Sequence, residues 1–168
     1  MALKIITGGQ SGVDRAALDV AIALGIPYGG WCPRGGWAED LPDPPGLLAR
    51  YPRLRETPLS DPAQRTQWNL RDSEAVLIIA LASGLAVSKG TALAREIAER
   101  DDKPLLVVGP DEADAALRAA QWLAGLLAGR DRNRLLALGI GGPRESEAPG
   151  IYQTAVEFLR AVLRAAAI

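Results

Sequence analysis

The stretch LKIITGGQSGVDRAALDVAIAL, residues 3–24, joins a short apolar run to a helical pattern through a glycine-rich turn. The apolar run at residues 3–7 predicts a buried strand, and apolar side chains recur at helical spacing over residues 13–24. A strand that leads directly into a helix is the repeating unit of parallel sheets with crossover helices. This stretch therefore predicts an α/β protein.

The same alternation continues along the chain. We expect further strands at residues 27–32, 75–81, 104–108 and 135–140, and helices at residues 62–72, 91–100, 111–127 and 150–166. Residues 33–61 are rich in proline and charge, which predicts a long irregular excursion of the functional kind. Residues 1–168 together predict one Rossmann-like domain, with a doubly wound, mostly parallel sheet of about five or six strands and helices on both faces.

Composition excludes several classes of protein. The 168 residues carry 19 basic and 20 acidic side chains, a net charge of −1, which argues against a nucleic-acid partner. There is no histidine, so Ser–His triads and histidine-ligated metals are excluded and no metal site is expected. The single cysteine, Cys32, is expected to be buried and unreactive in a reduced, cytoplasmic setting. We expect no signal peptide, because the chain starts directly with a strand-like segment. We expect no membrane partner, because residues 75–88, the longest uncharged stretch, fall short of the ~20 residues of a spanning helix.

The first glycine-rich turn is a candidate phosphate cradle. Glycines let the backbone approach a ligand, and the amides at a helix N-terminus attract anions. The turn fits neither the dinucleotide pattern nor the Walker pattern, and a tight turn that needs glycine only for packing is the alternative. The candidate ligand-binding residues here are Gly8, Gly9, Gln10, Ser11, Gly12, Asp14 and Arg15.

A second loop of this kind, residues 83–91, leads from the most apolar predicted strand into a helix. In a parallel sheet both loops open at the carboxyl edge, and adjacent ones at the strand-order reversal form a ligand crevice. We expect an anion there to meet the Lys89 charge and the Thr91 hydroxyl, although a solvated lysine and a capping threonine are the alternative. The candidates from this loop are Ser88, Lys89, Gly90 and Thr91.

The excursion begins with GGWCPRGGWAED, residues 29–40, which is dense in glycine and tryptophan. Trp31 and Trp37 offer planar surfaces for a heterocycle, and Arg34, Glu39 and Asp40 offer polar edges, unless the tryptophans simply cover the core.

Two further sets of side chains are candidates for the same site. Arg65, Trp68, Asn69 and Asp72 share one helical face, which is either a ligand-binding face or solvated surface. Arg144 follows the last predicted strand and is placed either at the crevice or in a surface turn.

The motifs GGQSGVDRAALD, GGWCPRGGWAED, ETPLSDPAQRTQWNLRDS, SKGTAL and GPRESEAPGIY, in this order, resemble those of the putative molybdenum carrier family. That family resembles the nucleotide-binding Rossmann-like superfamily that includes the cytokinin-activating phosphoribohydrolases. The resemblance implies that the glycine loops hold molybdenum cofactor (molybdopterin), a pterin phosphate, or a nucleotide. The phosphoribohydrolase pattern Gly-Gly-x-Gly-Thr-x-x-Glu would place its glutamate at Ala94, which has no carboxylate.

Two functions follow from these observations. The favoured one is a non-catalytic binding protein for a small phosphorylated pterin or nucleotide, which the resemblance suggests is a carrier of molybdenum cofactor, and we expect it to form a homo-oligomer. The alternative is a nucleotide N-glycoside hydrolase in which Asp14 or Asp40 acts as the acid or base.

Overall fold

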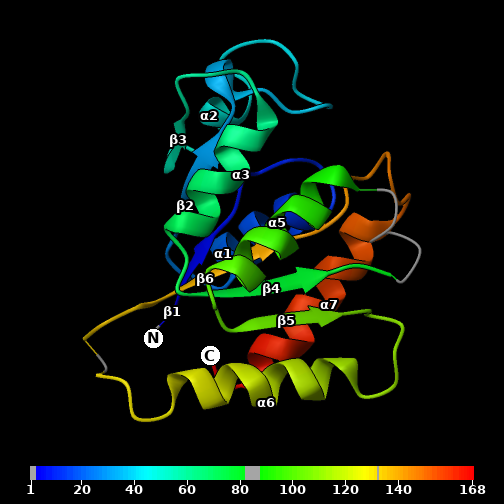
Figure 1. Ribbon diagram of the computed structural model, residues 1–168. Coiled ribbons are helices and arrows are strands. Elements are labelled where there is room, and N and C mark those ends of the chain that lie inside the picture. Colours follow the sequence, from blue (N-terminus) through cyan, green and yellow to red (C-terminus); the bar gives the residue numbers. More distant parts are fainter. Residues whose placement is uncertain (1–2, 82–87, 132) are drawn as a thin grey trace.

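A computed structural model describes residues 3–81, 88–131 and 133–168 (Figure 1). Its single sheet is six-stranded and entirely parallel, with the strand order β3-β2-β1-β6-β4-β5. The strands are β1 (Leu3–Ile6), β2 (Tyr28–Cys32), β3 (Leu54–Glu56), β4 (Ala75–Ile79), β5 (Leu105–Val108) and β6 (Leu136–Gly141). The helices are α1 (Val13–Ala23), α2 (Leu47–Arg50), α3 (Pro62–Arg71), α5 (Lys89–Arg100), α6 (Ala115–Leu127) and α7 (Ile151–Ala165), with a 3₁₀ turn η1 (Arg34–Gly36). The predicted doubly wound α/β class is confirmed.

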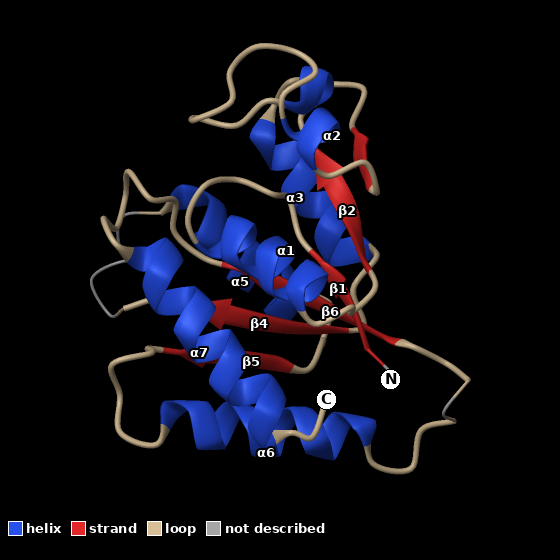
Figure 2. Cartoon of the chain, turned by 180° about the vertical axis from the view of Figure 1, so that it is seen from behind, coloured by secondary structure: helices blue, strands red, loops and turns tan. Residues whose placement is uncertain are grey.

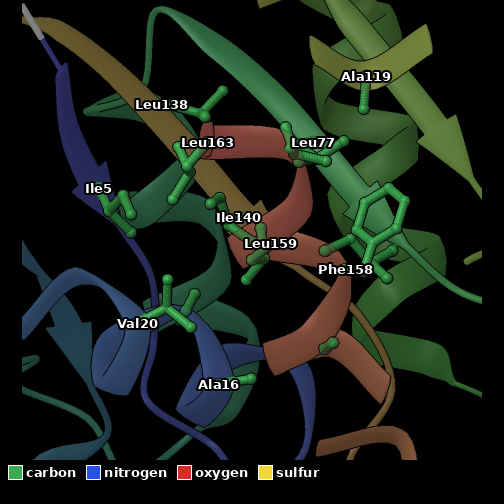
Figure 3. Packing of buried hydrophobic residues seen from close by; sticks show 14 of the residues in the cluster. Ile5, Ala16, Val20, Leu77, Ala119, Leu138, Ile140, Phe158, Leu159 and Leu163 are labelled. Atoms are coloured by element: carbon green, nitrogen blue, oxygen red, sulfur yellow. The ribbon is translucent and has the colours of Figure 1, made fainter. Parts of the chain in front are cut away.

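The helices form two layers. Figure 1 shows α3 and α5 on the near side of the sheet, and Figure 2 shows α1 and α7 on the opposite side. The larger core lies between the sheet and helices α1, α6 and α7. In Figure 3 Phe158 and Leu159 of α7 lie beside Leu77 of β4 and Ile140 of β6. Burying a side chain of this size stabilises the fold by about 1.5–3 kcal/mol, so this layer carries most of the apolar stabilisation.

Strand β6 has two unlike faces. Leu138 and Ile140 point into the larger core, and because side chains alternate along a strand, Gly139 and Gly141 face the α3/α5 layer. The smaller core on that side is built from β4, α3 and α5 and has no large side chain from β6. The centre of the sheet is therefore left bare on the side covered by α3 and α5.

Of the described helices, α3 and α5 begin at side-chain caps, whereas α1, α6 and α7 have none, and α6 begins four residues later than expected. The Asp61 side chain accepts a hydrogen bond from the Ala63 N–H at 2.9 Å and Pro62 occupies the first turn, which caps α3. Helix α5 begins two residues earlier than expected, because Ser88 serves as its N-cap and accepts from the Thr91 N–H at 3.3 Å.

The predicted irregular excursion is wrong in part. Residues 33–61 contain η1, α2 and the edge strand β3, and β3 pairs in parallel with β2. Leu47, Tyr51 and Leu54 from this segment are buried against Leu18 of α1 in a third apolar cluster. The sequence did not predict this packing. The segment is rich in proline and charge, its strand is short, and its apolar side chains follow no clear period.

The end of β6 offers a stability test. A Cβ added at Gly142 would lie 2.2 Å from the Ile79 carbonyl oxygen, whereas one at Gly141 would meet only Asp14 Oδ1, at 3.6 Å. We expect Gly142→Ala to lower the free energy of unfolding by about 1–3 kcal/mol through overpacking, and Gly141→Ala to cost less than about 1 kcal/mol. Urea denaturation of both variants measures the difference. Equal stability of the two variants would show that the Ile79 carbonyl does not lie as close to Gly142 as described.

Candidate functional site

A cavity of about 210 Å³ opens over β1, β6 and β4, between helices α3 and α5. The expectation that the two glycine loops follow adjacent strands is wrong, because β6 lies between β1 and β4. The loops nevertheless meet at one cavity, since Gly139 and Gly141 leave its floor open. The two glycines of β6 thus let residues of both loops line one cavity, although the strands before these loops are not neighbours.

The cavity gathers part of the predicted site. The predicted residues that line it are Gly8, Gln10, Asp14, Arg65, Asn69, Ser88, Lys89, Gly90, Thr91 and Arg144. Those that do not line it are Gly9, Ser11, Gly12, Arg15, Trp31, Arg34, Asp40 and Asp72. Residues 83–87 of the second loop lie outside the described residues.

A buried ion pair stands at one end of the cavity. Asp14, in the first turn of α1, accepts a hydrogen bond from Arg65 Nη1 of α3 at 2.8 Å. The guanidinium of Arg65 lies against Gly8, where any side chain would displace it. Burial raises the pKa of Asp14 and outweighs the opposing effects of Arg65 and of the Gly8 and Gln10 backbone N–H groups. The first glycine loop therefore already directs amides at a carboxylate of the protein itself.

The remaining polar groups of the first loop fasten neighbouring segments. Gln10 Oε1 accepts from the N–H groups of Ser11 and Glu39 at 3.0 and 2.9 Å. Ser11 Oγ bonds the Glu39 carboxylate and accepts from the Glu145 N–H at 3.1 Å. Burial raises the pKa of Glu39, but its hydrogen bonds with Ser11 and Ser146 outweigh this and hold the pKa below its usual value. These contacts tie the start of the excursion to the loop after β6.

Two glycines of the first loop are explained by structure alone. Gly9 has a φ of +71°, and a side chain there would point at Leu54 and Leu18. Gly12 has a φ of +78°, and a Cβ there would lie 2.3 Å from the Pro143 carbonyl oxygen. Packing thus accounts for both, as the alternative interpretation of this turn held.

Arg15 and Asp40 form a second ion pair outside the cavity. The two nitrogens of the Arg15 fork donate to the two Asp40 oxygens at 2.9 Å each, and Arg15 Nε donates to the Gly9 carbonyl at 3.2 Å. The Arg15 side chain is 5% exposed and that of Asp40 is 45% exposed. The pair holds the excursion against α1.

The tryptophan expected to stack on a ligand contacts α3 instead. Trp31 packs edge-on against Trp68, with ring centroids 4.7 Å apart, and its Nε1 donates to Asp72 at 2.7 Å. The Asn69 side chain bonds the backbone N–H and carbonyl of Trp31 at 2.8 and 2.9 Å. The polar face of α3 is therefore a contact surface for β2, while Arg34 is exposed.

Cys32 is fully buried, and burial raises the pKa of its thiol to about 11, which keeps it protonated at neutral pH.

The other end of the cavity is the N-terminus of α5. Ser88 Oγ accepts from the Thr91 N–H and from Thr91 Oγ1, at 3.3 and 2.8 Å. Lys89 and Gly90 are exposed in the first turn, and a Cβ at Gly90 would meet nothing within 4 Å. This helix end thus presents open backbone and a positive charge to the cavity.

Arg144 stands at the cavity mouth with weak partners. Its nearest carboxylate oxygens, on Glu39 and Glu147, are 3.9 Å away, and its guanidinium lies 6.0 Å from the Trp37 ring centroid. Such long contacts leave the guanidinium able to bind another anion.

Thr7, Gly139 and Gly141 are among the cavity residues that sequence reasoning did not name as binding residues. Thr7 Oγ1 is buried without a hydrogen-bond partner among the described residues, as is Arg65 Nε. Buried polar atoms normally have partners, so both are candidates for ligand contact. The run of glycines at 139, 141 and 142 was the available signal for the cavity floor.

Within the described ranges, no group of three or more acidic or cysteine side chains is placed to hold a metal ion. None of the helices described is long and apolar enough to cross a membrane.

The parallel sheet, its two helical layers and the cavity at its carboxyl edge define a Rossmann-like α/β protein. Residues 5–163 match the circularly permutated YpsA SLOG family (cpYpsA), and the chain belongs to that family, which lies in a Rossmann-like superfamily. A solved structure of a putative molybdenum carrier protein from Syntrophus aciditrophicus SB is similar to it, with 38% identity, a TM-score of 0.80 and 96% of each chain covered. A comparison with curated proteins finds no match. The resemblance seen in the motifs is confirmed.

The Arg15–Asp40 pair predicts a pH-dependent stability. Burial raises the pKa of Asp40, but the hydrogen bonds and charge of Arg15 outweigh this and hold the pKa below its usual value. The stabilisation is present above the unfolded pKa and is lost as the pH falls through the folded one. Because Asp40 is half exposed, we expect Asp40→Asn to cost only about 1 kcal/mol at neutral pH, and less with increasing acidity below the unfolded pKa.

Urea denaturation of the wild type and Asp40→Asn at neutral and acidic pH measures this difference. Asp43→Asn is the control, since this exposed neighbour forms no ion pair within the described chain. A difference that stays constant with pH would contradict the pairing.

Proposed function

We propose that this protein binds a small phosphorylated pterin or nucleotide in the cavity between α3 and α5 and serves as a carrier of molybdenum cofactor. The observation that carries the proposal is a cavity lined by three cationic side chains and one acidic one among the residues described. The cations are Arg65, Lys89 and Arg144, and the acid is Asp14.

Two glycines support a ligand at this position. Gly90 and Gly141 line the cavity with φ outside the left-handed region. A Cβ would meet nothing within 4 Å at Gly90, and at Gly141 only Asp14 Oδ1 at an ordinary 3.6 Å. Neither the backbone nor packing requires glycine there, whereas a ligand that lies against the backbone does.

Charge favours an anion at the α5 end of the cavity. The first-turn N–H groups of a helix carry partial positive charge, and Lys89 adds a full one beside them. The first loop is less suited, since the buried Asp14 carboxyl group lines the cavity beside Gly8 and Gln10. We therefore place the phosphate near Lys89 and Gly90.

Molybdenum cofactor, as the ligand that is carried, matches the polar groups that line the cavity. A pterin phosphate needs cations for its phosphate and polar groups for its ring, and Thr7 Oγ1 and Arg65 Nε are buried and unpaired within the described chain. The 38% identical relative is named as a putative molybdenum carrier, which supports the same role here. A homo-oligomeric, cytoplasmic protein is part of this proposal.

The hydrolase alternative is less well supported. Ala94 lines the cavity at the position where the phosphoribohydrolase pattern requires glutamate, and a methyl group neither activates water nor stabilises positive charge. Glu96 is exposed and does not line the cavity. Asp40 pairs with Arg15 outside it.

Protein purified from its own host tests the proposed function directly. We expect native mass spectrometry to detect a bound phosphorylated heterocycle, and denaturation to release near-ultraviolet absorption and fluorescence typical of a pterin. Release of ribose 5-phosphate from AMP faster than about 1 per second, an ordinary enzyme turnover, would instead support the hydrolase.

The open glycine at the cavity floor gives a second test. We expect Gly141→Val to fold, because valine suits a strand, and to bind GMP and 6-hydroxymethylpterin phosphate at least about tenfold more weakly, about 1.4 kcal/mol. Gly125→Ala in α6 is the matched control, since its Cβ also meets nothing within 4 Å but lies outside the cavity. Isothermal titration calorimetry compares them, and unchanged affinity in a folded Gly141→Val would contradict this site.

A further inference from the structure

One oxygen of the buried Asp14 carboxylate is directed at the cavity floor. Oδ2 accepts the hydrogen bond from Arg65 Nη1, whereas Oδ1 faces the space above Gly141, where an added Cβ would lie 3.6 Å away. Asp14 is 6% exposed and lines the cavity. The Arg65 contact holds the carboxyl group at Oδ2 and leaves Oδ1 toward the cavity floor.

Unpaired donors lie in the same cavity. Arg65 Nε and Thr7 Oγ1 are buried without partners in the described ranges, and both residues line the cavity with Asp14. A buried donor without a partner destabilises the protein, so a ligand that pairs with these atoms is favoured. The cavity thus offers polar groups without partners next to Asp14 Oδ1.

A specific ring edge is complementary to this arrangement. The 2-amino-4-oxo-pyrimidine edge, which pterins and guanine share, presents a carbonyl oxygen, a ring N–H and an amino group in succession. The N–H and amino groups can both donate to one carboxylate, and the carbonyl accepts from a neighbouring donor. Adenine presents an amino group next to a ring acceptor, which would face the Asp14 oxygens with a lone pair.

We propose that Asp14 selects ligands with a 2-amino-4-oxo-pyrimidine edge, with the ring over Gly141 and the phosphate toward Lys89. This rests on the proposed function, since it places the ring in the same cavity. The absent side chain of Gly141 lets the ring reach Oδ1, and the Arg65 ion pair holds that oxygen in place.

Matched ligand pairs test the selection on the unaltered protein. We expect GMP to bind at least tenfold more tightly than AMP, or 6-hydroxymethylpterin phosphate at least tenfold more tightly than its 2-oxo (lumazine) counterpart, measured by isothermal titration calorimetry. The pair with the larger affinity ratio shows whether the preferred ligand is a nucleotide or a pterin. Ratios near one in both pairs would overturn the selection while leaving the proposed function intact. Absence of binding by all four ligands would overturn the proposed function as well.

A variant identifies the residue responsible. We expect Asp14→Asn to weaken binding of the amino-oxo ligand at least tenfold and to leave its counterpart within about threefold, which removes the discrimination. Glu74→Gln is the matched control, because it also removes a carboxylate paired with arginines, Arg130 and Arg134, but lies outside the cavity. Retained discrimination in a folded Asp14→Asn would overturn the assignment. If that variant does not fold, the ligand pairs on the wild type decide.

Discussion

The alternation of side chains along β6 is the constraint on which the rest of this structure depends. On one face Leu136, Leu138 and Ile140 anchor the larger apolar core, and on the other Gly139 and Gly141 leave a bare surface. Because β6 lies between β1 and β4, this surface is at the centre of the sheet. The fold can therefore bury its main core and keep a ligand-sized space with the same strand.

The polar residues around that space divide into two groups with different roles. Gln10, Ser11, Arg15, Glu39 and Asp40 bond one another and hold the excursion and the loop after β6 against α1. Arg65, Lys89 and Arg144 surround the opening with positive charge. The first group makes the cavity wall rigid, and such support keeps binding groups in place without contacting a ligand.

The buried Asp14–Arg65 pair links these groups. A buried ion pair is costly to form, and it is weak evidence for stability because apolar residues of equal volume often serve as well. The pair lies at the end of the cavity, with one carboxylate oxygen facing the open floor, and this position suits a binding role better than a stabilising one. In the proposed binding mode, fold and recognition depend on the same contact between α1 and α3.

Residues 3–24, the apolar strand at 75–79 and the capped start of α3 could be predicted from the sequence, because strand periodicity, helical periodicity and capping are local properties. The motifs also identified the family and the three cationic residues that line the cavity in the described ranges. The place of β6 between β1 and β4, the packing of Trp31 on α3 and the strand β3 depend on contacts between distant segments. No local pattern encodes them, since a tryptophan or a glycine has the same local signal whether it contacts a ligand or another helix. Only the tertiary structure decided which glycines serve packing and which, at 90 and 141, border the open space of the cavity, because that depends on what a side chain there would meet.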